Sequence, residues 1–278
     1  SMRSELNQLD INGQIVIGEG ELDEAPMLYI GEKIGTKNGP DIDIAVDPLE
    51  GTKFAANNLP GALSVIAIAE KNNLLKAPET YMEKISANVH EKEVVDLDYS
   101  IKKNIYNLSD YLNKKPEDLT ACIMDRPRHK AIINELNKIG VNIKLITDGD
   151  VSGALLVSND KYNVDIFLGI GGGPEGVLAS AALDTLSCSF QGRFLFDNDE
   201  DKKRAHMMGI TNLTKKYELN EIVKGDSIFC ATGITSGDLV SGIKIENNEF
   251  ISETFVTHKS SGTIKVIKKV IDLSLIHI

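Results

Sequence analysis

The chain contains a strand pattern, a loop and a helix pattern, in that order, three times in succession: in TACIMDRPRHKAIINELNKIG (120–140), VNIKLITDGDVSGALLV (141–157) and VDIFLGIGGGPEGVLASAALDTL (164–186). Each strand pattern is short and apolar, and each helix pattern repeats its apolar residues with helical spacing. Strands that alternate with helices form a mostly parallel sheet, whose functional loops follow the carboxyl ends of the strands. This part of the chain is therefore predicted to be α/β.

The residues before about position 100 have a different pattern, typical of α+β structure with hairpins. Strands are predicted at Gln14–Ile17, 41–47, 61–71 and 91–99, and a short helix at 25–35. Because proline has no N–H group for a strand ladder, the strand at 41–47 is expected to end at Pro48. The tail returns to strands. The expected fold class is α/β, with an α+β first half and an α/β second half.

The composition argues against several functional classes. The 278 residues have a formal net charge of −11 that is not gathered in one tail, which disfavours a nucleic-acid-binding surface and a basic membrane patch. The three cysteines form no CxxC pair and the five histidines form no zinc pattern, as expected of a cytoplasmic protein with reduced cysteines. No apolar run approaches the roughly 20 residues that cross a bilayer, and the polar start, SMRSELNQLD, is unlike a signal peptide.

Four loops combine carboxylates with glycines at the ends of predicted strands. They are IGEGELDEAP, with Glu19, Glu21, Asp23 and Glu24; VDPLEGT, with Asp47 and Glu50; TDGDVSG, with Asp148 and Asp150; and GIGGGPEG, with Glu175. A single acidic loop is usually solvent-exposed and without function. Four such loops without Cys or His instead form an oxygen-rich set that suits Mg²⁺ or Mn²⁺, and none has the spacing of a calcium-binding EF-hand.

The turn VDPLEGT is the strongest candidate for a metal site. The proline fixes the turn, so Asp47 and Glu50 are expected to point to one side with the Leu49 carbonyl between them. Gly51 and Thr52 begin a helix or tight turn whose free N–H groups are able to hold a phosphate oxygen. We therefore predict a metal and a phosphate side by side at this turn.

A basic loop and a glycine-rich loop leave alternatives open. Arg126 and Arg128, in DRPRHK, form either a fork for a phosphate or a solvated basic face. GIGGGPEG lets the backbone approach a ligand closely, or is only a tight strand-to-helix turn. A dinucleotide site is disfavoured, because Pro174 stands where GxGxxG has its third glycine. Tyr81, in PETYMEK, either hydrogen-bonds a ligand or packs.

Six segments, taken in order, carry a resemblance to a known family: IVIGEGELDEAPMLYIGEKIG, DIAVDPLEGT, APETYMEKI, DRPRH, TDGDVSG and GIGGGPEGVLASAAL. The chain resembles class II fructose-1,6-bisphosphatase, of the lithium-sensitive, metal-dependent sugar phosphatase superfamily. The resemblance implies a layered α/β/α/β/α sandwich. We expect a metal-binding α+β domain at about residues 1–118 and an α/β substrate-binding domain at about residues 119–278, with the last strands able to rejoin the first domain.

The resemblance also implies a role for each loop. Mg²⁺ or Mn²⁺ at the reactive 1-phosphate would be bound by Glu19, Asp47, Glu50, Glu175 and the Leu49 carbonyl. That end of the substrate would be contacted by Glu50, Gly51, Thr52 and Glu175. Thr52, with Asp47 and Glu50, would orient and help to deprotonate the attacking water. The sugar would be held by Asp148 and Asp150, and the 6-phosphate by Tyr81, Arg126 and Arg128.

These roles predict a gluconeogenic enzyme that hydrolyses the 1-phosphate of fructose 1,6-bisphosphate with a metal-activated water. Its partner is a small sugar bisphosphate rather than a nucleic acid or a membrane, and a homo-oligomer is expected. One alternative is a related sugar phosphatase that acts on sedoheptulose bisphosphate or inositol phosphate. The other is a non-catalytic sugar-phosphate-binding protein. Arg126 and Arg128 favour a bisphosphate, because the second phosphate needs a cation.

Thr52 is not sufficient as a base, since a hydroxyl is too weak an acid–base group at neutral pH. In the family, an aspartate that pairs with this threonine, and a nearby lysine, belong to a helical segment that precedes the point where this chain begins. The resemblance therefore implies that the chain as printed binds metal but has weak or no catalysis, whereas the complete gene product is the enzyme.

Overall fold

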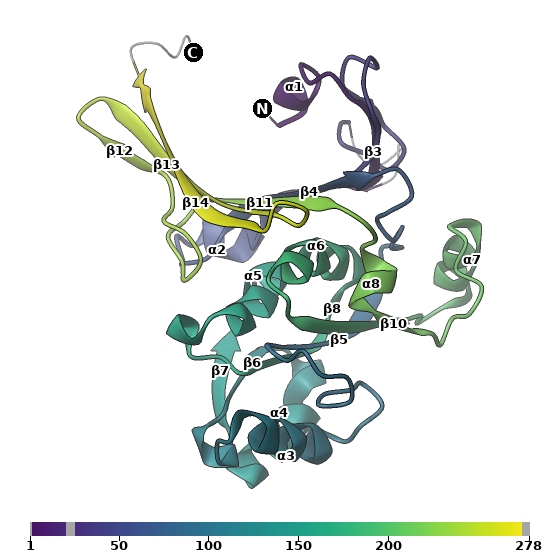
Figure 1. Ribbon diagram of the computed structural model, residues 1–278, viewed down its shortest axis with the longest axis vertical. Helices are drawn as coiled ribbons and strands as arrows, with labels where there is room; N and C mark the ends of the chain where they lie inside the picture. Colours follow the sequence, from purple (N-terminus) through teal and green to yellow (C-terminus); the bar gives the residue numbers. More distant parts are fainter. Residues whose placement is uncertain (1, 21–25, 274–278) are drawn as a thin grey trace.

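The computed structural model describes residues 2–20 and 26–273, which form two sheets with helices between and outside them (Figure 1). The large sheet contains β1 (Asn12–Ile17), β2 (Lys33–Ile34), β3 (Asp41–Glu50), β4 (Leu63–Glu70), β11 (Ser227–Gly233), β12 (Lys244–Glu246), β13 (Glu249–His258) and β14 (Thr263–Asp272). The second sheet contains β5 (Tyr81–Ala87), β6 (Thr120–Met124), β7 (Asn142–Ile146), β8 (Ile166–Gly172), β9 (Ser189–Leu195) and β10 (Lys216–Glu218). The helices are α1 (Met2–Leu6), α2 (Thr52–Ala56), α3 (Ile101–Leu112), α4 (Lys130–Ile139), α5 (Asp150–Leu155), α6 (Gly173–Thr185), α7 (Asp199–Met207) and α8 (Leu219–Ile222).

The second sheet confirms the three strand–loop–helix units predicted from the sequence. β6 leads to α4, β7 to α5 and β8 to α6. β6 is parallel to both β7 and β8, and the strand order is β10-β9-β5-β8-β6-β7. The loops after these three strands therefore open at the same edge of the sheet, as the sequence pattern predicted.

The large sheet brings the two ends of the chain together. Its order is β12-β13-β11-β4-β3-β1-β2, with β14 paired to β13. β1 and β3 are parallel. The successive pairs β3–β4, β4–β11 and β11–β13 are antiparallel. The strands after residue 226 thus complete a sheet that begins near the start of the chain. The division into two domains near residue 118 stays a prediction.

The two sheets and the helices lie in layers. In Figure 1, α5 and α6 lie between the sheets, α3 and α4 cover the outer face of the second sheet, and α1 lies beyond the large sheet. Most of α6 is buried, because its GVLASAAL stretch is small or apolar on every side. β4 alternates accordingly, with Leu63, Val65 and Ala67 buried in the core shared with α6. The layered α/β fold class is confirmed.

The helix predicted at 25–35 is wrong for the described residues 26–35, which form turns and the short strand β2. Leu28, Gly31 and Gly35 have φ of 56°, 93° and 94°, values that a right-handed helix excludes. Ile34 pairs with Gly13 of β1 instead. Leu28 and Ile34, two of the apolar residues whose spacing suggested a helix, are instead buried in the core around α1.

Two strand predictions also need correction. The segment 91–99 forms turns rather than an edge strand, because the carboxylates of Asp96 and Asp98 bind Lys216 of β10 at 2.6 and 2.9 Å. β3 does not end at Pro48 but continues to Glu50. Its pairing with β4 shifts between Asp47 and Glu50, so the proline interrupts the ladder without ending the strand.

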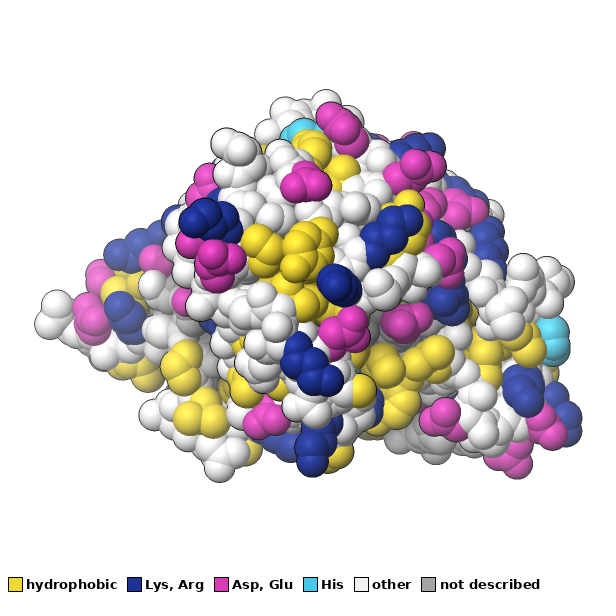
Figure 2. All heavy atoms as spheres, turned by 90° about the horizontal axis from the view of Figure 1, so that it is seen from below, with side chains coloured by type: hydrophobic (Ala, Val, Ile, Leu, Met, Phe, Trp, Pro, Cys, Tyr) yellow, Lys and Arg dark blue, Asp and Glu magenta, His cyan; other side chains and the backbone are white. Residues whose placement is uncertain are grey.

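The surface carries charges of both signs. On the face below α3 and α4, Lys and Arg side chains are interspersed with Asp and Glu side chains, so the described residues seen there form no extended basic surface (Figure 2). Within residues 2–20 and 26–273, none of the helices has the length and apolar character needed to span a membrane.

Candidate active site

A cavity of about 700 Å³ lies where the loops after β1, β3 and β8 meet the start of β5. Six of the residues predicted to act on a substrate or metal line it: Glu19, Asp47, Leu49, Thr52, Tyr81 and Glu175. They are separated by up to 156 positions in the sequence. The fold therefore gathers loops from both sheets around one space, where a ligand can contact them together.

The other predicted residues are not in the lining of this cavity, and one of them, Asp148, lines the smaller cavity described below. They are Glu50, Gly51, Arg126, Arg128, Asp148 and Asp150. The acidic residues Glu21, Asp23 and Glu24 fall outside the described residues.

The turn at the end of β3 has a defined local geometry. Asp47 accepts a hydrogen bond from the Leu49 N–H at 3.0 Å, which closes the turn over Pro48. Glu50 is buried, and its Oε1 accepts the N–H of Val151 in α5 at 3.0 Å. The Oε2 atom of Glu50 is also buried and has no hydrogen-bond partner among the described residues. A buried carboxylate oxygen without a partner is costly, and a cation or donor would satisfy it.

Gly51 is the single residue that joins β3 to α2. Its φ of 79° is left-handed and suits glycine, and Thr52 then begins the helix. The N–H of Lys53 donates to Asp148 Oδ2 at 3.1 Å. The first turn of α2 is thus tied to the loop after β7, and Thr52 is held at the cavity wall.

The carboxylates of the site repel one another. Burial, followed by the charges of Glu175 and Glu19, raises the pKa of Asp47 to about 7. Burial, followed by the charge of Asp47, raises the pKa of Glu50 well above its usual range. The pKa of Glu175 is also raised by burial, and the charge of Lys84 opposes this effect. A positive charge placed among these side chains would relieve the repulsion.

A divalent cation fits this set chemically. The donors are all oxygens, as Mg²⁺ and Mn²⁺ prefer, and the Glu50 Oε2 atom lacks a partner within the described part of the chain. No three Asp, Glu, His or Cys side chains among residues 2–20 and 26–273 already form a metal-binding group.

The basic loop after β6 is anchored to the two neighbouring loops. Arg126 donates to the Thr147 carbonyl at 2.6 Å and lies 3.5 Å from Asp148 Oδ1. Arg128 donates twice to the Ile170 carbonyl, at 3.0 and 2.8 Å, and its guanidinium lies 4.6 Å from the centre of the Tyr81 ring. The cation–π contact places a cation next to Tyr81, at the cavity wall.

His129 holds this loop in place from the inside. It is buried between the Met124 carbonyl, 2.6 Å from Nδ1, and the Ile170 N–H, 2.7 Å from Nε2. A ring that donates from Nδ1 and accepts at Nε2 is neutral, and burial lowers the pKa of His129 accordingly. His129 and Arg128 thus fix both backbone groups of Ile170.

Asp150 forms a buried ion pair that the sequence interpretation missed. Its Oδ2 atom accepts from Lys84 Nζ, and the Lys84 side chain is 1% exposed. A signal was present: in YMEKISA, period-two alternation places Lys84 on the same face as Met82 and Ser86, and all three are buried. A lysine on a buried face requires an acidic partner.

Further acidic residues at the cavity were also missed. Glu79, Asp197 and Asp201 contribute to its lining. Asp197 and Asp201 belong to the acidic run FDNDED, which follows β9 and includes the first turn of α7, where Asn198 caps the helix by accepting the Asp201 N–H at 2.8 Å. An acidic run after a strand was the signal that could have identified them.

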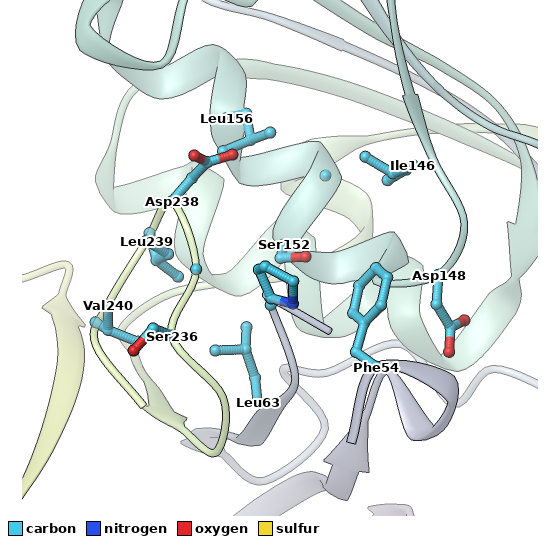
Figure 3. Close-up of a pocket in the computed structure, with 14 residues that line it drawn as sticks. Phe54, Leu63, Ile146, Asp148, Ser152, Leu156, Ser236, Asp238, Leu239 and Val240 are labelled. Carbon is cyan, nitrogen blue, oxygen red and sulfur yellow. The ribbon is translucent and has the colours of Figure 1, made fainter. Parts of the chain in front are cut away.

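A second cavity, of about 320 Å³, lies behind α2 (Figure 3). Phe54 of α2, Leu63 of β4 and Ser152 of α5 point into it. A Cβ atom on Gly149 would lie 2.8 Å from Phe54 Cε2, so a glycine is needed for the ring to pack there. The contact joins the helix that carries Thr52 to the start of α5 and Asp150.

Comparison with known proteins gives a consistent result. The family model described as bacterial fructose-1,6-bisphosphatase, glpX-encoded, matches residues 1–271. "D-fructose 1,6-bisphosphatase class 2/sedoheptulose 1,7-bisphosphatase" from Synechococcus sp. (strain JA-3-3Ab) is 40% identical over 292 residues, which cover 96% of this chain and 84% of that protein. "Fructose-1,6-bisphosphatase 1 class 2" from Escherichia coli (strain K12) is 42% identical over 284 residues, with 97% and 84% covered.

Proposed function

Because the chain belongs to the bacterial class II fructose-1,6-bisphosphatase family, we propose that it hydrolyses fructose 1,6-bisphosphate to fructose 6-phosphate and phosphate at this site. The observation that carries the assignment to this site is the cavity of about 700 Å³, in which Glu19, Asp47 and Glu175 face the same space as Thr52 and Tyr81. Phosphoryl transfer depends on positioning and charge neutralisation, and this site offers groups for both.

The proposed cofactor is Mg²⁺ or Mn²⁺, held by Glu19, Asp47, Glu50, Glu175 and the Leu49 carbonyl. A bound divalent ion would offset the phosphate charge and lower the pKa of a water. The raised pKa values of Asp47 and Glu50 and the unpartnered Glu50 Oε2 support this assignment.

The chain's own residues would bind and orient the substrate. Thr52 is the first residue of α2 and lines the cavity, and its hydroxyl and N–H would hold the 1-phosphate and orient the attacking water. Asp148, in the loop after β7, and Asp150, the first residue of α5, would accept hydrogen bonds from sugar hydroxyls. Tyr81 and Arg128 stack at the cavity edge and, with Arg126, would hold the 6-phosphate.

A substrate panel tests the activity. Phosphate release would be measured with fructose 1,6-bisphosphate, sedoheptulose 1,7-bisphosphate and inositol 1-phosphate, each with Mg²⁺, Mn²⁺ or EDTA. We expect release from fructose 1,6-bisphosphate with a divalent ion and none with EDTA. Release from inositol 1-phosphate alone would favour a different sugar phosphatase. Calorimetric binding of fructose 1,6-bisphosphate without any release would favour a non-catalytic binding protein.

Sedoheptulose 1,7-bisphosphate is a second candidate substrate. The relative from Synechococcus and one from Prochlorococcus marinus (strain MIT 9515), 41% identical over 262 residues, are both named for this activity as well. The substrate panel shows whether the protein hydrolyses fructose 1,6-bisphosphate alone or sedoheptulose 1,7-bisphosphate as well.

We also propose that the protein acts in gluconeogenesis in the cytoplasm as a homo-oligomer. Support for association comes from β14, where Ile264, Val266 and Val270 are each about half exposed, at 51%, 49% and 48%. Exposed apolar side chains on a strand at a sheet edge favour pairing with another surface. Light scattering on the eluted peak of a sizing column tests it, and a monomer mass at micromolar concentration would contradict it.

A further inference from the structure

Lys84 is a buried charge next to the proposed catalytic site. It lies in the middle of β5, its side chain is 1% exposed, and its Nζ binds Asp150 Oδ2. Burying an ion pair costs more in desolvation than it usually returns in attraction, so such pairs often add little stability relative to apolar side chains. A role in function is therefore expected for this pair in addition to any role in stability.

The glycine-rich loop leaves room for this pair and for Glu175. A Cβ atom on Gly171 would lie 1.9 Å from Asp150 Oδ2, and one on Gly172 would lie 1.9 Å from Glu175 Oε2. A Cβ atom on Gly176 would lie 3.3 Å from Lys84 Cε and 2.6 Å from the Met82 sulfur. The GIGGGPEG segment is thus more than a tight turn, because its glycines make space for the buried Lys84 and Asp150 and for the partly buried Glu175.

The two oxygens of Asp150 have different surroundings. Oδ2 binds Lys84, whereas Oδ1 is buried without a hydrogen-bond partner among the described residues. An ion pair with a purely structural role would be expected to satisfy both oxygens. Lys84 thus holds one oxygen of Asp150, and the other oxygen lacks a donor within the described part of the chain.

Lys84 also lies close to the elements that carry the proposed metal ligands. A Cβ atom on Gly176, next to Glu175, would lie 3.3 Å from Lys84 Cε. Its partner Asp150 precedes Val151, whose N–H donates to Glu50 Oε1 at 3.0 Å. A fixed cation between these carboxylates limits their repulsion of an anionic substrate.

We propose that Lys84 is a positioning residue, which fixes the Asp150 carboxylate for a sugar hydroxyl and offsets the negative charge around Glu175. The proposal rests on the proposed function for its substrate. It predicts two opposite effects when the charge is removed. Binding of the bisphosphate weakens, whereas binding of a divalent cation becomes tighter, because the same carboxylates have lost a competing positive charge.

The test compares Lys84→Met, Asp150→Asn and the double variant. For Lys84→Met we expect the KM for fructose 1,6-bisphosphate to rise by about 10- to 100-fold, as for loss of a hydrogen bond to a charged group. In the Asp150→Asn background the same change should raise the KM by a smaller factor, since part of the effect of Lys84 passes through Asp150. Additive effects of the two substitutions, or an unchanged KM in Lys84→Met, would overturn the proposal.

Mn²⁺ binding to the substrate-free protein gives a readout that does not depend on activity. By calorimetry, Lys84→Met is expected to bind Mn²⁺ several-fold more tightly than wild type, and Asp150→Asn more weakly. If the Mn²⁺ affinities of Lys84→Met and Asp150→Asn changed in the same direction, the charge role of Lys84 would be contradicted. If wild type releases no phosphate from fructose 1,6-bisphosphate, the proposed function fails while the Mn²⁺ measurement still decides on Lys84.

Two further variants serve as controls. Lys71→Met removes an exposed lysine that pairs with Asp41 at 3.0 Å, and it should leave both KM and Mn²⁺ affinity within about twofold of wild type. Lys84→Arg keeps the charge and should retain wild-type Mn²⁺ affinity. Should Lys84→Met fail to fold by circular dichroism, Lys84→Arg and Asp150→Asn carry the test, and matching Mn²⁺ affinities for these two would refute it.

Discussion

At the scale of single residues, Asp47 makes stability depend on pH. Burial and neighbouring carboxylates raise its pKa to about 7, so the folded protein holds a proton that the unfolded chain, with a pKa near 3.8, has lost. The free energy of unfolding without metal is therefore expected to fall as the pH rises from about 4 to about 7, and to level off above that.

Urea unfolding in EDTA at about pH 5 and about pH 7 measures this fall. Asp47→Asn should reduce it, because an amide has no proton to lose in this range. Asp41→Asn, at an exposed carboxylate whose pKa is lowered by its hydrogen bond to Lys71, should not reduce it. An identical fall in wild type and Asp47→Asn would refute the role given to Asp47.

Arg128 provides a second residue-scale prediction. Its two hydrogen bonds to Ile170 and its position over the Tyr81 ring need a planar guanidinium, which lysine lacks. Arg128→Lys is expected to raise the KM for fructose 1,6-bisphosphate about tenfold, as for loss of one charged hydrogen bond. Fructose 1-phosphate, which has no 6-phosphate, should show little change. Equal effects on the two substrates would remove Arg128 from the 6-phosphate site.

At the scale of elements, the junction of α2 and α5 depends on Gly149. Its φ is 81°, and an added Cβ would lie 2.7 Å from Ser152 Oγ and 2.8 Å from Phe54 Cε2. Gly149→Ala therefore combines backbone strain with overpacking and should cost about 2–4 kcal/mol. Gly140→Ala is a matched control, with φ of 93° and nothing within 4 Å of its Cβ, so it should cost only about 1 kcal/mol. Equal losses in urea unfolding would show that packing against Phe54 does not matter.

The elements also show how far the sequence could predict the structure. The units around β6, β7 and β8 were predictable, because apolar periodicity and glycine loops are local signals. The segment 26–35 was not, since its positive φ values and its pairing with β1 are set by tertiary contacts. Within the site, loop position predicted that Glu19, Asp47 and Glu175 face one cavity. Lys84 was not predicted to be a site residue, because its partner Asp150 lies 66 positions away in the sequence.

At the scale of the whole molecule, the proposed ligands belong to both sheets. Asp47 and Glu50 end β3 of the large sheet, whereas Glu175 lies in α6, which follows β8 of the second sheet. A cation bound by all of them would join the two sheets directly. Metal binding should therefore stabilise the molecule as a whole and not only the loops that touch the ion.

Thermal unfolding with and without Mn²⁺ tests this link. A ligand that binds only the folded state adds about 2.7 kcal/mol at a concentration 100 times its dissociation constant, so we expect Tm to rise by several degrees. Glu50→Gln should lose most of this rise, because Glu50 Oε2 is buried and has no hydrogen-bond partner within residues 2–20 and 26–273. Glu70→Gln, at an exposed carboxylate on β4, should keep it. A rise of the same size in Glu50→Gln, or one reproduced by NaCl of equal ionic strength, would mean that the stabilisation comes from general screening and not from an ion held between the sheets.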